Sequence, residues 1–143
     1  MAAKPRVVVD TNVFVAGVIN PAGSPGAVLR ALRKKRFVLV SSAPINEEIT
    51  KVLARPYIRD RYHVADRIFD ISFLIWELAE IVTDPPHVKI SSDPKDDKFL
   101  SAAVGGQADY LMTGDIGDLL HLHEYQGVTI LSPREFLPII GAL

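Results

Sequence analysis

Residues 6–12 read RVVVDTN, and this stretch carries much of the information about the fold. Three consecutive valines, with no polar residue between them, are typical of a strand that is buried on both faces, as in a parallel sheet. The apolar run stops at Asp10, so we expect a strand over Arg6–Val9 that ends in a polar loop. Ligands of open α/β sheets bind beyond the carboxyl ends of the strands, which makes Asp10 a candidate site residue.

Strands and helices alternate along the rest of the chain. Short apolar runs predict strands, and apolar residues at helical spacing between prolines and glycines predict helices. The further expected strands are Phe37–Val40, Tyr110–Met112, Val128–Leu131 and, less clearly marked, Val88–Ile90. The expected helices run over residues 24–35, 44–53, 64–82, 94–105 and 133–140. This order predicts one α/β domain over residues 1–143, a three-layer α/β/α sandwich with a mainly parallel sheet of four or five strands.

The composition narrows the class of protein. A chain of 143 residues with 48% hydrophobic residues is large enough for one domain with a single core. The net charge of −1 does not favour long-range attraction to a polyanion, so any affinity for nucleic acid must come from local patches. With no cysteine, thiolate metal sites and cysteine nucleophiles are excluded. Because no apolar run suits a signal sequence or a membrane span, we expect a cytoplasmic protein.

Two acidic residues are expected at the same edge of the sheet. Asp10 directly follows the first strand, and Asp115 follows the strand Tyr110–Met112. Asp97 belongs to the first turn of the helix that precedes this strand, and Glu48 belongs to the helix after the second strand. Clustered carboxylates repel one another, so such a site requires a cation. Oxygen ligands without cysteine or clustered histidine favour Mg²⁺ or Mn²⁺, bound as one or two ions.

Helical phase distinguishes Glu48 from its neighbour. At about 100° per residue, Glu48 borders the apolar face of its helix, whereas Glu47 points away from it and should be solvated. The same test does not choose between Asp96 and Asp97, because Asp96 lies near the centre of the inward face and Asp97 at its edge.

Three segments resemble the PIN domain family: VVVDTNVFVAG at residues 7–17, INEEITKVL at 45–53 and DDKFLSAAVGGQADYLMTGDIGDL at 96–119. The likeness covers nearly the whole chain, including the order and spacing of the four acids. It is greatest to members that act as toxins of toxin–antitoxin pairs, in which a stretch like LARPYIRDRY, residues 53–62, also follows the glutamate helix.

This resemblance implies an endoribonuclease that cleaves single-stranded RNA with Mg²⁺ or Mn²⁺. By position, its catalytic and metal-binding acids are Asp10, Glu48, Asp97 and Asp115. It also implies supporting roles for Asn12 and Thr113, which would orient the carboxylates or a metal-bound water, and a supporting or ligand role for Asp96. Many members carry a further acid two residues after the fourth aspartate. Here that acid is delayed to Asp118, whose role stays open.

Binding partners are predicted from two surfaces. Arg55, Arg59 and Arg61, interleaved with tyrosines, are candidate RNA contacts, although a merely solvated surface explains them equally well. The helix over Val64–Val82 offers apolar surface for a homodimer or an antitoxin, and Trp76 belongs either to the core or to such a face. His121 and His123 are expected to be surface residues and not metal ligands.

Other interpretations of the same residues remain open. Asp93 and Asp96 suit the N-cap and capping-box positions of a helix, and Asp97 suits the positive end of its dipole. An aspartate after the first strand could also be a phosphate acceptor. Phosphatases of this kind usually need a second acid two residues later, where this chain has Asn12. The last alternative is a non-catalytic PIN-like module that binds RNA or protein.

Overall fold

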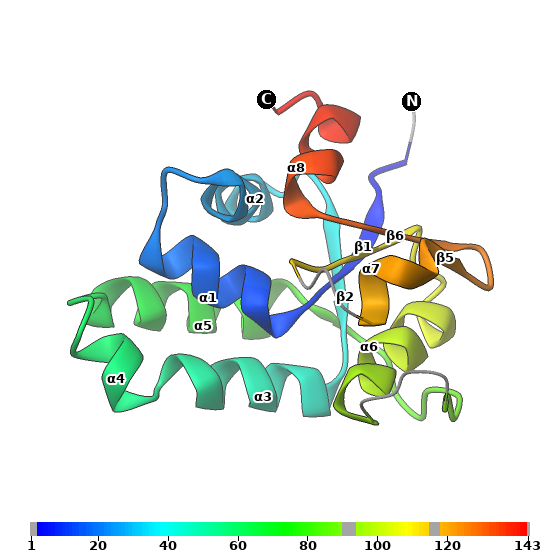
Figure 1. Cartoon of the computed structure of the whole chain (residues 1–143), viewed down its shortest axis with the longest axis horizontal. Helices are drawn as coiled ribbons and strands as arrows, with labels where there is room; N and C mark the ends of the chain where they lie inside the picture. The colour runs from blue at the N-terminus through cyan, green and yellow to red at the C-terminus, as the bar shows by residue number, and fades with distance from the viewer. Residues whose placement is uncertain (1–2, 90–93, 115–117, 143) are drawn as a thin grey trace.

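A six-stranded sheet forms the centre of the computed structural model, which describes residues 3–89, 94–114 and 118–142 (Figure 1). The strand order is β3-β2-β1-β4-β6-β5, and every neighbouring pair is parallel except β5 and β6. The strands are β1 Arg6–Val9, β2 Val38–Ser41, β3 Glu80–Ile81, β4 Tyr110–Met112, β5 Glu124–Tyr125 and β6 Val128–Leu131. The prediction of a mainly parallel α/β sheet is therefore confirmed.

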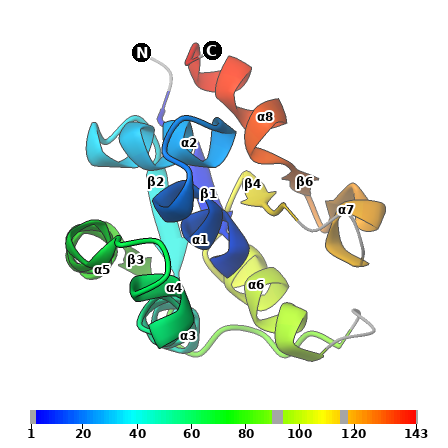
Figure 2. The same cartoon turned by 60° about the vertical axis from the view of Figure 1, so that its left-hand side comes forward.

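Helices cover both faces of this sheet (Figure 2). They are α1 Thr11–Ile19, α2 Ser24–Arg33, α3 Ala43–Leu53, α4 Pro56–Arg59, α5 Ala65–Leu78, α6 Pro94–Gly105, α7 Asp118–Leu122 and α8 Pro133–Phe136, followed by a 3-10 turn over Leu137–Ile140. On one side α6 packs against β1, β2 and β4, and α7 packs against β6. On the other side α1 packs against α2 and α3, and α5 against β2 and α3. The three layers agree with the predicted sandwich.

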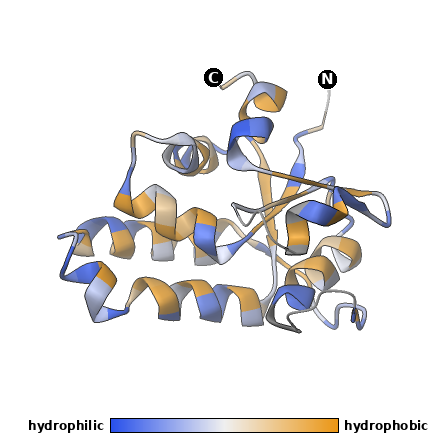
Figure 3. Cartoon of the chain, viewed as in Figure 1, coloured by the Kyte–Doolittle hydropathy of each residue, from blue (hydrophilic) through white to orange (hydrophobic). Residues whose placement is uncertain are grey.

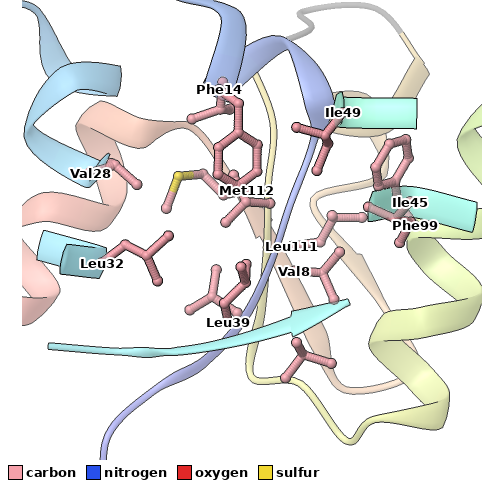
Figure 4. Packing of buried hydrophobic residues seen from close by; sticks show 14 of the residues in the cluster. Val8, Phe14, Val28, Leu32, Leu39, Ile45, Ile49, Phe99, Leu111 and Met112 are labelled. Atoms are coloured by element: carbon pink, nitrogen blue, oxygen red, sulfur yellow. The ribbon is translucent and has the colours of Figure 1, made fainter. Parts of the chain in front are cut away.

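The hydrophobic core lies on both faces of the central strands. The side chains of Val7, Val8 and Val9 are at most 2% exposed, as expected for a strand without a solvent face. Figure 4 shows Val8, Leu39 and Leu111 of three adjacent strands, with apolar side chains packed around them that come from α1, α2, α3 and α6. Apolar and polar stretches alternate along α3 and α5 in Figure 3, as in helices with one buried face. Within the described ranges, no helix is long and apolar enough to cross a membrane.

The structure corrects two expected helix boundaries. The polar residues after β1 do not form a loop, because α1 begins at Thr11, directly after Asp10. The expected helix over Val64–Val82 is longer than the observed one: α5 spans Ala65–Leu78, and Glu80 and Ile81 pair with Val40 and Ser41 of β2. Hydrogen bonding to a distant strand thus ends a helix whose apolar spacing alone would continue it.

The number of strands also differs from the prediction. β3 and β5 have two residues each, too few to leave an apolar pattern in the sequence, and they raise the count above the expected four or five. The strand expected over Val88–Ile90 is wrong for Val88 and Lys89, which lie outside any strand. Ile90 lies outside the described residues.

Candidate functional site

Asp10 lies at the carboxyl end of β1, where the chain turns directly into α1. Its backbone N–H donates to the carbonyl oxygen of Met112 on β4, at 2.9 Å, which ties the strand end to its neighbour. The Thr113 hydroxyl, completely buried, donates to Oδ2 of Asp10 at 2.8 Å. Parallel pairing of β1 with β4 therefore brings two residues that are 103 positions apart into one site.

The carboxyl group of Asp10 lies in a poorly solvated position. Burial raises the pKa of Asp10 above its ordinary value of 3.8, and the negative charge of Glu48 acts in the same direction. The Thr113 hydroxyl and the backbone N–H groups of Asn12 and Thr11 oppose this rise because they favour the charged form. The balance of these effects is a raised pKa, which a nearby cation would bring down.

Glu48 lies beside Asp10 and has partners on both of its carboxylate oxygens. The Thr11 hydroxyl donates to Oε2. The Lys98 ammonium lies 2.6 Å from Oε1 and forms an ion pair that is about one-quarter exposed on either side. Glu48 is half-buried, whereas Glu47 is exposed, so the choice made from helical phase is confirmed. Ser42, the N-cap of α3, accepts a hydrogen bond from the backbone N–H of Ile45 and fixes this phase.

Asp96 and Asp97 occupy the first turn of α6, and both are half-buried. Neither burial nor helical phase therefore shows which of the two is the better candidate ligand. Pro94 is the first residue of α6, as expected, while the predicted N-cap Asp93 lies outside the described residues. Their position in the first turn also fits the alternative in which these acids only cap the helix.

Asp115 lies outside the described residues, so its predicted role as a fourth ligand stays a prediction. Asp118 begins α7, but its side chain is likewise not described. Oδ1 of Asn12 accepts a hydrogen bond from the backbone N–H of Gly114 at 3.2 Å, and the expected role of Asn12 in orienting carboxylates or water stays a prediction. Asn12 thereby holds Gly114, two residues beyond the end of β4.

The chemistry of this pair fits a hard divalent cation. Asp10 and Glu48 offer carboxylate oxygens, close enough together for the charge of Glu48 to raise the pKa of Asp10, at the sheet edge where ligands of such folds bind. In the part of the chain that is described, however, no three aspartate, glutamate or histidine side chains lie close enough to hold a metal ion. Asp97 does not complete such a group with Asp10 and Glu48, and its role as a ligand stays a prediction.

The other predicted contacts lie away from this pair. Arg55, Arg59 and Arg61 are exposed around α4, which follows the far end of α3 in Figure 1. Arg59 pairs with Asp60 at 3.0 Å, and the Arg61 guanidinium lies 5.7 Å from the ring centre of Tyr62. Their role in RNA binding remains a prediction. His121 and His123 are exposed, as expected.

Two residues of the site were not predicted. Thr11 lies between two residues that were singled out, but its hydroxyl bonds to Glu48, which is 37 positions away. Lys98 directly follows Asp96 and Asp97 in the sequence, but its ammonium contacts Glu48, which is 50 positions away. The sequence does contain a signal for Lys98: it directly follows Asp97, and a cation beside clustered acids relieves their repulsion.

The chain is similar to known proteins over most of its length. A family model described as "PIN domain" matches residues 6–117, a range that contains Asp10, Glu48, Asp97 and Asp115. The chain is also 31% identical over 142 residues to an uncharacterized protein of Methanocaldococcus jannaschii. That similarity covers 94% of this chain and 90% of the archaeal protein.

Proposed function

The chain belongs to the PIN domain family, and on this basis we propose that it is a metal-dependent endoribonuclease that cleaves single-stranded RNA. PIN domains are in general metal-dependent nucleases. In this proposal, one or two Mg²⁺ or Mn²⁺ ions are bound by the four acids Asp10, Glu48, Asp97 and Asp115. The observation that carries it is the buried carboxyl group of Asp10, with a second carboxylate beside it and a pKa raised by both effects.

In this proposal, a threonine hydroxyl holds each of the two carboxylates, Asp10 and Glu48, in place. When bound, a divalent ion would hold a phosphate of the RNA backbone and activate a water molecule to attack it. The Thr113 hydroxyl orients Asp10 and favours its ionised form, the form that binds a cation. The Thr11 hydroxyl holds one oxygen of Glu48 and so limits rotation of this carboxylate. Prior orientation of charged groups is an effective way to stabilise developing charge.

A protein partner is part of the proposal: the chain acts as the toxin of a toxin–antitoxin pair and forms a homodimer. Its support is an exposed aromatic face on α5, where Phe69, Phe73 and Trp76 are 73%, 63% and 49% exposed. Their spacing places them along one side of the helix, and exposed apolar patches of this kind mark interaction surfaces. Trp76 thus lies outside the core, with its Nε1 donating to the Thr50 hydroxyl at 3.3 Å.

Light scattering with Phe73→Ser tests the homodimer. We expect a dimeric wild-type protein and a monomeric variant, because the substitution removes apolar surface from the centre of this face. A wild-type protein that stays monomeric at high concentration contradicts the homodimer, but leaves the nuclease untouched.

Cleavage of labelled single-stranded RNA by the purified protein tests the nuclease. The reaction is run with Mg²⁺ or Mn²⁺, with EDTA, and with the variants Asp10→Asn and Asp97→Asn. Asp66→Asn is the matched control, because Asp66 is an exposed acid in the first turn of a different helix, α5. We expect cleavage by wild type and Asp66→Asn only, and only with metal present.

Two results would contradict this expectation in different ways. Equal cleavage by wild type and Asp97→Asn would remove Asp97 from the site or point to a contaminating nuclease. Absence of cleavage by folded wild-type protein on several RNAs would favour the non-catalytic module instead.

A further inference from the structure

A cavity of about 350 Å³ is lined in part by Lys98, the residue that pairs with Glu48 of the acidic pair Asp10 and Glu48. One wall is the segment 85–89, which leads from β3 toward α6, and the other is formed by Asp97, Lys98 and Ser101 of α6. This volume falls at the lower end of the range for small-molecule sites in proteins, about 300–1,000 Å³. The cavity can therefore accept a group of the size of a nucleotide.

Specific contacts hold the two walls together. The Ser101 hydroxyl, in a residue that is 9% exposed, donates to the carbonyl oxygen of Pro86. Gly105 allows the same approach one turn later, because a Cβ at that position would lie only 2.9 Å from Cδ of Pro86. The segment 85–89 is thus fastened to α6 and gives the cavity a defined shape.

The lining combines cationic and apolar groups. Lys89 and Lys98 contribute two ammonium groups beside the carboxylate of Asp97, and the Lys98 ammonium is also paired with Glu48. Pro85, Pro86 and Val88 contribute apolar surface, and His87 contributes an aromatic ring. Ammonium groups bind backbone phosphates, while proline and histidine offer flat or apolar surface to a base that is not paired in a duplex.

Lys98 connects this cavity to the acidic pair. Its ammonium lies 2.6 Å from Oε1 of Glu48, and the same residue lines the cavity. A nucleotide held here would accordingly lie one side chain away from Glu48, with Asp10 next to it. Lys98 therefore links the cavity to Glu48, one of the residues assigned to metal binding in the proposed reaction.

We propose that this cavity is a substrate subsite, which binds one unpaired nucleotide of single-stranded RNA next to the scissile phosphate. Lys89 and Lys98 bind the backbone phosphate, and the base or ribose lies against Pro86 and His87. This assignment rests on the proposed function, because it takes its substrate from it. Lys89, which is exposed, would give a chain of net charge −1 a local cation for the RNA backbone.

Binding without cleavage tests the subsite separately from the reaction. The probe is a short fluorescent oligonucleotide of 2′-O-methyl RNA, and its anisotropy is measured in EDTA over a series of salt concentrations. The variants are Lys89→Gln and His87→Ala, both at exposed positions, and the matched control is Lys51→Gln, an exposed lysine on α3. We expect Lys89→Gln to weaken binding several-fold and to reduce the slope of log affinity against log salt by about one.

The other variants have equally definite expectations. His87→Ala should weaken binding about fivefold or more through lost stacking, with little change in the salt slope. Lys51→Gln should match wild type in both measurements. Unchanged affinity and salt slope in Lys89→Gln and His87→Ala would overturn the subsite, as would an absence of probe binding by the wild-type protein.

Cleavage assays then separate this proposal from the proposed function. A wild-type protein that cuts RNA, with Lys89→Gln raising KM and leaving kcat nearly unchanged, supports both. Cutting that is equally efficient in wild type and Lys89→Gln overturns the subsite and leaves the nuclease standing. Loss of probe binding in Lys89→Gln, with no cutting by wild type, supports the RNA subsite and overturns the nuclease.

Discussion

The ammonium of Lys98 lies 2.6 Å from the Oε1 carboxylate oxygen of Glu48, and the two residues come from different helices, α6 and α3. This cation offsets the charge of Glu48, one of the two carboxylates of the acidic pair. A divalent ion bound to Glu48 would compete with it for the same carboxylate. Lys98 therefore links metal binding, through Glu48, to the cavity that it also lines.

Lys98→Met should tighten the binding of Mn²⁺ to the protein in the absence of RNA. Removal of the competing ammonium leaves more negative charge for the ion, and because the pair is partly exposed we expect about 1 kcal/mol, or about fivefold in affinity. Calorimetric titration of wild type, Lys98→Met and the control Lys51→Met measures the effect. Equal Mn²⁺ affinity in all three would show that the ion does not compete with Lys98.

Asp10→Asn should stabilise the metal-free protein at neutral pH. Burial raises the pKa of Asp10 above 3.8, so the folded state binds a proton more tightly than the unfolded state does. The stability that this group contributes is complete below the unfolded pKa and is lost as the pH rises through the raised folded pKa. Asparagine carries no charge at any pH and avoids this loss.

Thermal unfolding in EDTA over a range of pH measures this difference. The advantage of Asp10→Asn should be present at neutral pH and should shrink as the pH falls toward 3.8. The exposed control Asp66→Asn should follow wild type. A variant that is less stable than wild type at neutral pH would show that the hydrogen bonds of the carboxylate outweigh its burial.

Thr113→Val should move the acid limb of the pH–rate profile to higher pH. The Thr113 hydroxyl donates to Asp10 at 2.8 Å and lowers the pKa of this buried carboxyl group, so its loss raises that pKa further. A hydrogen bond to a charged group is worth enough to shift the limb by about one pH unit. Thr113→Ser retains the hydroxyl and should keep the wild-type profile, whereas identical profiles for Val and Ser would argue against this role.

Gly26→Ala should destabilise the fold by about 1–3 kcal/mol through overpacking. A Cβ on Gly26, in the first turn of α2, would lie 2.1 Å from the carbonyl oxygen of Pro21, a backbone atom that cannot move aside cheaply. Gly23→Ala is the matched control, because its Cβ would meet its nearest neighbour, Nδ2 of Asn20, at an ordinary 3.5 Å. Denaturant unfolding of both variants measures the difference, and equal stabilities would show that the Pro21 turn adapts.

Local sequence determined much of this protein. The valine run before Asp10 indicated a buried parallel strand, and the helical phase of residues 45–53 correctly placed Glu48 rather than Glu47 at the inward edge of α3. Both are consequences of backbone periodicity and of the removal of apolar surface from water, which act over a few residues. Position relative to strand ends also pointed to Asp10, next to Thr113 in the structure.

Only the tertiary structure decided the partners of these side chains. The end of α5 depends on pairing of Glu80 and Ile81 with β2, and the partners of Glu48 come from α1 and α6. Asp96 and Asp97 show the limit of local patterns, since neither helical phase nor burial indicates which of them is the candidate ligand. Hydrogen bonds and ion pairs between residues 37 to 103 positions apart depend on how whole elements pack, and no local pattern encodes that packing.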